Sequence, residues 1–430
     1  MKIKISEEDI ENVNQNPLEL FYQGIRAEAT RDKYTRTLRR IVCDVLEDVL
    51  QGSFEDRVIQ LVKRAKIDTD WGLGILLTIS RKQKERTKLD SDNPDYLNPV
   101  SFDNTFKPLK KLFDMNDVPI VWKRVYATFP ENNNINSSSR GYTRDEIHSM
   151  LNFAKGAMDR AIILVAASSG IRPGAMEFNW EDITPVYKVD NKIVLEITES
   201  QESQAEIVCA MITIYRKTYA EIPSFITPEA YQALMNWKKV WMTEVGREPK
   251  QGEPVFKRAG PFAKQAKAEA IKRRIERVLA GATILPPMVK GQKRREVPAM
   301  YGFRRFFNKT NKETISKDSS LAALIKKEFM MDHTGLISLD RNYFKTHVIE
   351  LIEEYLNAVP NLTISTEERI KAENLKLLKE KSELEHERQE NKNLRNDLDT
   401  LKKSVNRLIQ KDTIRDKITP VSGDDLDVQS

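Results

Sequence analysis

The sequence predicts a mainly α-helical protein with a small β-sheet: a helical N-terminal domain, an α+β domain and a helical C-terminal tail. Three observations favour this class. Between residues 17 and 128, apolar residues recur at helical spacing and strand signals are scarce. Two strand-like runs, residues 192–198 and 206–215, fall within an otherwise helical second region. After residue 365 the charge rises and apolar residues thin to a heptad spacing.

Length and composition bound the architecture and the cellular setting. A chain of 430 residues exceeds what one core usually organises, so two or three domains are expected. No apolar run reaches the roughly 18 residues of a membrane span, and the start lacks the apolar stretch of a secretory signal. The only cysteines, Cys43 and Cys209, exclude a disulfide framework and a cysteine zinc site. A reducing intracellular compartment is expected.

Positive charge is spread in clusters. The net charge is +6 and the pI is about 8.9, which suits a polyanionic partner. An ordinary solvated helix face is an equally open reading of any one cluster. The residues expected to contact phosphates are Arg36, Arg39, Arg40, Lys82, Lys84, Lys290, Lys293 and Arg294.

The first part of the chain is interpreted as an N-terminal extension (1–16), a helical domain (17–128) and a polar, turn-forming linker (129–141). Thr30 is predicted to cap a helix whose apolar face continues to Val49. That face comprises Tyr34, Leu38, Ile41, Val42, Val45, Leu46 and Val49. Further helices are expected over residues 56–66, 71–88 and 101–113.

The second domain is expected over residues 142–364. Thr143 and Glu146 form a capping box, and residues 161–167 form a buried helix that ends at Gly170. Another helix is expected to begin at Thr227 with proline in its first turn. A basic stretch, residues 250–300, contains a predicted helix over 261–279.

The tail is interpreted as a long helix with a short coiled coil (365–411), followed by a disordered, mildly acidic end (412–430). Because three early d positions hold carboxylates, only the later half of this helix has a convincing apolar seam. A single solvated helix without a coiled coil is the open alternative. Heptad a holds Ile370, Leu377, Leu384, Asn391, Leu398 and Val405, and heptad d holds Glu373, Glu380, Glu387, Leu394, Leu401 and Leu408.

Three short segments carry the chemistry. They are residues 170–174 with Arg172, residues 301–305 with Arg304, and residues 333–335 with His333, followed by Tyr343. Arginine suits a phosphodiester because its planar fork pairs with two oxygens and stays charged. A tyrosine hydroxyl can attack phosphorus and store the bond, given positive potential to lower a pKa of about 10. This set needs neither metal nor nucleotide cofactor.

Helical phase selects the tyrosine. Tyr355 shares an apolar face with Phe344 and Leu351, whereas Tyr343 lies about 100 degrees from Phe344 around the helix. Tyr355 is therefore expected in the core and Tyr343 toward a ligand. Each residue taken alone has a structural explanation, so their joint order carries the prediction.

This order resembles the tyrosine recombinases, or phage-type integrases, over about residues 17–360. Residues 167–172 followed by 180–183 resemble the first arginine block, and residues 301–304 resemble the second. Residues 331–333 and Tyr343 resemble the Gly-His block and the nucleophile. Residues 341–345 and 354–357 are closest to archaeal-type integrases.

The resemblance implies a core-binding domain and a catalytic domain that clamp double-stranded DNA at specific recombination sites, acting as a tetramer in the cytoplasm on the nucleoid. Tyr343 would form a 3′-phosphotyrosine and release a 5′-hydroxyl. Arg172 and Arg304 would hold the phosphate, and His333 would donate a hydrogen bond to it. Lys217 is the best match to the lysine that protonates the leaving oxygen. The tail coiled coil could support self-association.

The sequence departs from the family pattern at two positions. Tyr301 stands where a histidine is usual, with two roles open: a hydrogen bond to phosphate, or packing alone. Asp332 stands where glycine usually precedes the second histidine. Two alternatives accompany the recombinase hypothesis: a type IB topoisomerase, and a DNA-binding protein of the same fold that has lost catalysis.

Overall fold

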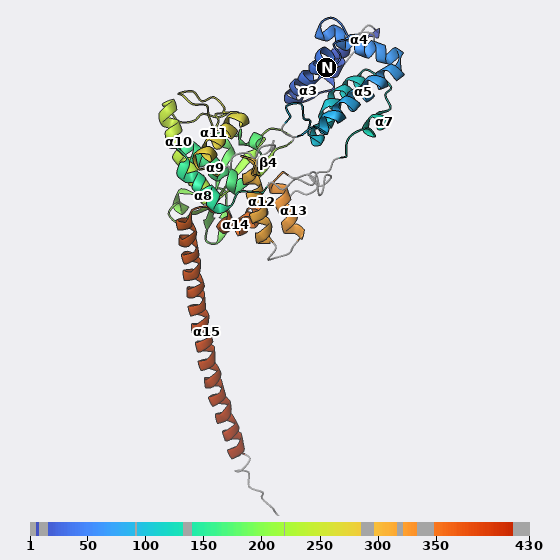
Figure 1. Cartoon of the computed structure of the whole chain (residues 1–430). Coiled ribbons are helices and arrows are strands. Elements are labelled where there is room, and N and C mark those ends of the chain that lie inside the picture. The colour runs from blue at the N-terminus through green and yellow to red at the C-terminus, as the bar shows by residue number, and fades with distance from the viewer. Residues whose placement is uncertain are drawn as a thin grey trace, which may run out of the picture. The chain divides into compact units, whose positions relative to one another are not determined.

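The computed structural model describes residues 6–7, 16–90, 93–131, 140–218, 220–284, 296–315, 321–332 and 348–415 (Figure 1). Described residues up to Arg140, with 296–298, form one compact unit, and the others from Gly141 onward form a second. Across these segments, no helix has the length and apolar character to cross a bilayer. The structure is mainly helical with one four-stranded sheet, which confirms the predicted fold class.

Among the described residues of the first unit, all of the regular secondary structure is helical. The core is aromatic, with Phe21, Phe102, Phe106 and Phe113 at most 1% exposed. The helices predicted near residues 56, 71 and 101 are confirmed. The elements are α2 (Pro17–Gln23), α3 (Glu28–Arg40), η1 (Ile41–Val45), α4 (Phe54–Ile67), α5 (Thr69–Thr87), η2 (Pro99–Ser101), α6 (Asp103–Met115) and α7 (Trp122–Tyr126).

The predicted start and face of α3 are partly wrong. The helix begins at Glu28, so Thr30 lies inside it and Ala27 takes the cap position. Beyond α3 the chain continues as the π-helical turn η1, which adds a residue per turn and shifts the phase of the apolar face. Val45 and Val49 consequently turn outward, at 44% and 43% exposure.

The second unit is built around helix α9 (Ala157–Ser169), which is the buried helix predicted from the sequence. Its apolar residues from Ala161 to Ala167 are all buried, so the surrounding elements cover it on every side. The Thr143–Glu146 capping box and the Thr227 cap are both confirmed. The other main helices are α8 (Arg144–Phe153), α10 (Pro228–Val245), α11 (Ala268–Gly281), α12 (Tyr301–Ile315), α13 (Leu321–Met330), α14 (Val348–Leu362) and α15 (Thr366–Arg415).

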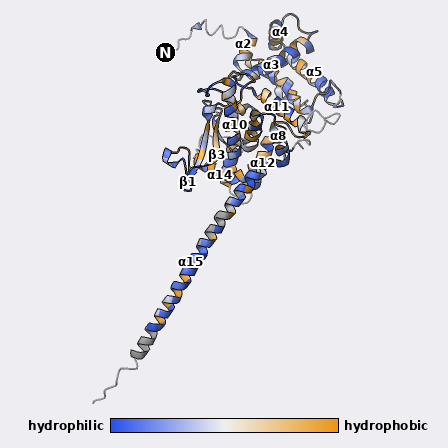
Figure 2. Cartoon of the chain, turned by 90° about the vertical axis from the view of Figure 1, so that its left-hand side faces the viewer, coloured by the Kyte–Doolittle hydropathy of each residue, from blue (hydrophilic) through white to orange (hydrophobic). Residues whose placement is uncertain are grey.

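The sheet is antiparallel, in the order β2-β1-β3-β4. The two predicted runs contain β2 (Lys192–Val194) and β3 (Glu206–Ile214), while β1 (Ile183–Val189) and β4 (Ile222–Ile226) were missed. Each missed strand contains a proline, Pro185 or Pro223, which weakens a strand signal because proline cannot donate to the ladder. Figure 2 shows hydrophobic residues in the strands and mostly hydrophilic residues along α15.

Helix α11 starts later than predicted. It begins at Ala268, whereas the sequence pattern favoured a start at residue 261. The intervening backbone folds back on itself instead, since Arg258 donates to the carbonyl of Lys264 and Ala266 donates to that of Phe256, at 2.8 and 2.9 Å. These bonds use backbone groups that a helix would need.

The C-terminal end of α9 is fixed by one glycine and one tyrosine. Gly170 caps the helix at φ +60°, and Phe307 packs against it so closely that a Cβ would lie 2.5 Å from the phenyl ring. The Tyr355 hydroxyl donates to the Ser168 carbonyl at 2.8 Å. Tyr355 is fully buried, which confirms its predicted place in the core. These contacts fix the direction in which the chain continues from α9 toward Arg172.

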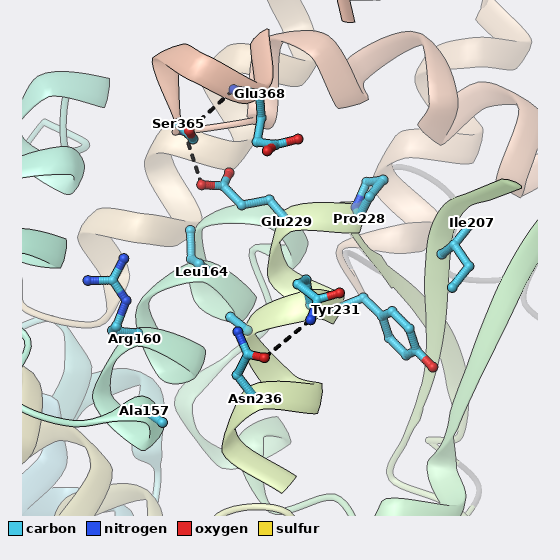
Figure 3. A pocket seen from close by; sticks show the side chains of 12 residues that line it. Ala157, Arg160, Leu164, Ile207, Pro228, Glu229, Tyr231, Asn236, Ser365 and Glu368 are labelled. Atoms are coloured by element: carbon cyan, nitrogen blue, oxygen red, sulfur yellow. Dashed lines mark hydrogen bonds between the residues drawn. The ribbon is translucent and has the colours of Figure 1, made fainter. Parts of the chain in front are cut away.

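The start of α15 is bound to α10. The Glu229 carboxylate accepts from the backbone N–H groups of Ile364 and Ser365, at 2.8 and 3.1 Å, beside a pocket lined by α9, α10 and Glu368 (Figure 3). Burial raises the pKa of Glu229, and the two N–H groups oppose this. The start of the tail helix is thus fixed to the second unit by hydrogen bonds.

Replacing Gly170 with alanine is expected to destabilise the second unit by about 3 kcal/mol, because the left-handed φ and the contact with Phe307 both disfavour a Cβ. The matched control is Gly246→Ala at φ +80°, where nothing lies within 4 Å of an added Cβ. It carries the conformational cost alone, about 1 kcal/mol. Urea unfolding of both variants measures the difference, and equal losses would contradict the packing argument.

Candidate functional site

Five side chains from separate segments gather beyond the C-terminal end of α9. Arg172 follows α9, Tyr301 and Arg304 lie on α12, Asp332 follows α13, and Tyr215 directly follows β3. Hydrogen bonds join both arginines to the segment after α13. Tyr215 and Tyr301 lie within electrostatic reach of Arg304, as does Asp332. The fold thus brings three of the predicted residues, Arg172, Arg304 and Tyr301, to one place.

Arg172 is held by the residue that departs from the family pattern. Its guanidinium pairs with the Asp332 carboxylate and also donates to the Asp332 carbonyl at 3.0 Å. The arginine side chain remains 38% exposed, whereas that of Asp332 is 17% exposed. Pro173 follows as the first residue of the short helix η3 (Pro173–Met176), as predicted. Arg172 therefore faces solvent with one carboxylate already bound.

Arg304 is a buried charge, at 8% exposure. It donates to the carbonyl of Gly170 at 2.8 Å and to that of Met331. Burial lowers the pKa of the guanidinium, and the charge of Arg172 lowers it further. Arginine still stays protonated at neutral pH. Because its two bonds are to carbonyl groups, its full positive charge remains available to an anion.

Tyr215 is a member of the cluster that the sequence prediction missed. It is half-buried, and burial raises the pKa of its phenol while the charges of Arg172 and Arg304 oppose the rise. Its φ of +55° is unusual for a bulky side chain. The Thr218 hydroxyl and N–H both donate to its carbonyl, at 2.6 and 3.1 Å. The sequence feature that could have indicated Tyr215 is its position two residues before the predicted Lys217.

Tyr301 is the first residue of α12 and is 50% exposed. It lies one helical turn before Arg304, so both side chains project from one face. Its exposure argues against the packing role, and its place beside the arginines suits hydrogen bonding to a ligand.

Lys217 lies on the turn between β3 and β4, two residues after Tyr215. It is exposed, its φ is +61°, and its backbone N–H donates to the Glu221 carboxylate at 2.6 Å. The turn therefore carries a phenol and an ammonium group near each other, although only the phenol is placed within the cluster. The nearby Arg216 is bound to Asp182 at 2.9 Å.

Several predicted residues lie outside the described part of the chain: His333, Tyr343, Lys290, Lys293 and Arg294. Those predicted in the first unit lie on two helices, with Arg36, Arg39 and Arg40 on α3 and Lys82 and Lys84 on α5. All are exposed except Lys84, which is partly buried. Arg39 stacks on the Phe54 ring at 4.3 Å. Within the described ranges, no three His, Cys, Asp or Glu side chains are grouped as a metal would require.

No protein-family model and no curated protein matches the sequence. Several solved structures share its general arrangement over most of the chain. The XerH recombinase in a post-cleavage complex with palindromic difH substrate is 14% identical, with 76% of this chain and 90% of that chain covered and a TM-score of 0.39.

Two integrases are similar to the same degree. A lambda integrase dimer on a COC′ core site is 12% identical, with 73% and 96% of the chains covered and a TM-score of 0.38. The Tn1549 transposon integrase with transposon right end DNA is 13% identical, with 79% and 98% covered and a TM-score of 0.40. Similarity at this level does not establish a function, which has to be argued from the residues.

A buried lysine lies on the helix that leads to the site. Lys327 of α13 is fully buried, and its ammonium group has no hydrogen-bond partner among the described residues. Burial lowers its pKa to about 8, and repulsion from Lys312 lowers it as well. Met331, whose carbonyl binds Arg304, donates to the Lys327 carbonyl at 3.2 Å.

Lys327 predicts how stability depends on pH. Its folded pKa lies below the unfolded value, so the folded state is penalised below about pH 8, and the free energy of unfolding rises as pH increases toward 10.5. Lys327→Met should add about 2 to 3 kcal/mol at pH 7 and flatten this rise. Denaturant unfolding between pH 7 and 10 tests it. The control is Lys309→Met, whose side chain is 78% exposed. If the free energy of unfolding of Lys327→Met rose with pH as steeply as that of the wild type, the prediction would be wrong.

Proposed function

We propose that this protein is a site-specific DNA recombinase or integrase that cleaves and rejoins DNA strands through a phosphotyrosine at Tyr343. One observation carries the proposal: Arg172 and Arg304, from distant segments, are held together by backbone carbonyls of the turns after α9 and α13. Two guanidiniums in one place repel each other, and the Asp332 carboxylate bound to Arg172 offsets part of that repulsion, as a phosphate could do between them. A phosphodiester is an anion with the two oxygens that such a pair can bind.

In the proposed reaction, both arginines bind the non-bridging oxygens and stabilise the charge that grows on them in the transition state. The Tyr343 oxygen forms a bond to phosphorus as the bond to the 5′-oxygen breaks. The phenol loses its proton, and the leaving oxygen gains one as it becomes a 5′-hydroxyl. A 5′-hydroxyl of another strand then reverses these steps. The number of phosphoester bonds is conserved, so no nucleotide cofactor is required.

The other roles follow from residue chemistry. His333 donates a hydrogen bond to the phosphate, and Lys217 protonates the leaving oxygen. Tyr215 and Tyr301 add two phenols beside the arginines. Because burial keeps the pKa of Tyr215 high, its hydroxyl remains protonated at neutral pH and can donate to a phosphate oxygen. The assisting functions are therefore shared among phenols where the family uses a histidine.

The biological setting is also proposed. Its substrate is double-stranded DNA with specific recombination sites, contacted by each of the domains at 17–128 and 142–364, which the segment 129–141 connects. A tetramer would align two such sites, in the cytoplasm and on the nucleoid. A monomeric type IB topoisomerase shares this chemistry, but the helical first domain and the linker favour the recombinase.

A trapping experiment tests the nucleophile. Nicked duplexes from a randomised pool lose the short strand after cleavage, so the enzyme should accumulate as a covalent protein–DNA adduct. Tyr343→Phe should abolish the adduct, because no hydroxyl remains to attack phosphorus. Arg172→Ala should slow its formation at least about 100-fold, since one transition-state donor is lost. Denaturing electrophoresis of labelled DNA measures both.

The control is Tyr355→Phe. Tyr355 is buried and donates only to the Ser168 carbonyl, so this variant should lose about 1 kcal/mol of stability and still form the adduct. An adduct that persists in Tyr343→Phe would show that another residue is the nucleophile. Tight DNA binding without any adduct would identify a non-catalytic DNA-binding protein.

Asp332 should compete with the scissile phosphate for Arg172. Its φ is +53°, a left-handed value that glycine adopts freely, so Asp332→Gly should leave the fold intact while freeing the guanidinium. DNA affinity should then rise several-fold at fixed salt, as measured by fluorescence anisotropy. In an Arg172→Ala background the same change should have no such effect. An equal gain in both backgrounds would show that only net charge had changed.

A further inference from the structure

The C-terminal half of α15 exposes a regular apolar stripe. Leu394, Leu398, Leu401 and Val405 are 64%, 53%, 64% and 48% exposed, although they recur at the spacing of a heptad seam. A helix with one continuous apolar stripe needs a partner to bury it. Such a partner has to supply a matching stripe of the same length, and a second α15 does so.

Charges beside the stripe determine how two such helices can pair. The e positions are all basic, with Arg388, Arg395 and Lys402, and the g positions of the same stretch are Glu390, Asp397 and the neutral Ser404. In a parallel pair, each g position faces the next e position of the other chain. Glu390 then faces Arg395, and Asp397 faces Lys402, so both contacts are attractive across both sides of the seam.

The antiparallel arrangement is disfavoured by the same charges. There, e positions face e positions and g positions face g positions, which brings arginine and lysine together on one side and carboxylates together on the other. Like charges at such distances repel. The segregation of basic residues at e and acidic residues at g therefore selects a parallel pair over an antiparallel one.

One polar seam residue sets the register. Asn391 occupies an a position between Leu384 and Leu398, and its amide donates to the Glu387 carbonyl at 3.0 Å. In a parallel, in-register pair the two Asn391 side chains meet and can hydrogen-bond each other. In any shifted register each would be buried against an apolar residue without a partner. Asparagine at a also favours two strands over higher oligomers.

We propose that α15 forms a parallel, in-register, two-stranded coiled coil with a second copy of this chain over residues 388–408. Because Glu229 fixes the start of α15 to α10, the coiled coil joins two catalytic units at the same end. Linking raises the effective concentration of the second unit, so the protein reaches a paired site as a preformed dimer. This inference does not rest on DNA cleavage.

Charge reversal in the full-length chain tests the pairing. The acidic variant is Arg388→Glu with Arg395→Glu and Lys402→Glu, and the basic variant is Glu390→Lys with Asp397→Lys. Sedimentation equilibrium should give a dimer for the wild type, monomers for each variant alone and a dimer for their equimolar mixture. The matched control, Lys392→Glu with Lys403→Glu, changes positions that face away from the seam and should remain dimeric. A monomeric wild type, or dimers of both variants alone, would overturn the proposal.

A cross-link distinguishes parallel from antiparallel pairing. In a Cys43→Ser background, Asn391→Cys should form an interchain disulfide in high yield, because equivalent a positions face each other only in the parallel, in-register pair. Leu398→Cys should behave likewise, while a mixture of the two should give few disulfides between positions 391 and 398. A dimer that resists oxidation at both positions would overturn the parallel arrangement.

Discussion

The site depends on one buried charge, the Arg304 guanidinium. It spans the Gly170 and Met331 carbonyls and so connects the end of α9, the start of α12 and the end of α13. Burying a cation is costly unless its N–H groups are satisfied, and here they are satisfied by neutral acceptors. A carboxylate partner would have neutralised the charge. The carbonyl groups preserve it, which makes an anion the group that completes the site.

The scaffold explains why these carbonyls are available. The carbonyl of Gly170 faces Arg304 because α9 ends there in a left-handed residue, with Phe307 packed in the space that a side chain would occupy. Phe307 lies one turn after Arg304 on the same face of α12, so the packing that fixes the glycine also fixes the arginine. Core geometry and site geometry are thus determined by the same few contacts.

Local signals made much of this predictable. Correct predictions were made where a feature depends on residues close in sequence. These features are the buried run of α9, its glycine end, Pro173 and the Thr143 capping box. The strands β1 and β4 were missed because their prolines suppress a local strand signal that pairing with β3 overrides. The Arg172–Asp332 pair could not be predicted, because it joins residues 160 positions apart. Such proximity is a property of the fold.

The two arginines differ in what a ligand has to do. Arg304 donates to two backbone carbonyls and to no carboxylate, so in the proposed reaction a phosphate approaches it without displacing another anion. Arg172 has to exchange the Asp332 carboxylate for the phosphate, while its bond to the Asp332 carbonyl can persist. Since one anion replaces another at a guanidinium already in position, binding requires a side-chain rotation and leaves the backbone where it is. Under the proposed function, Asp332 therefore keeps Arg172 in place without DNA and competes with the phosphate when DNA binds.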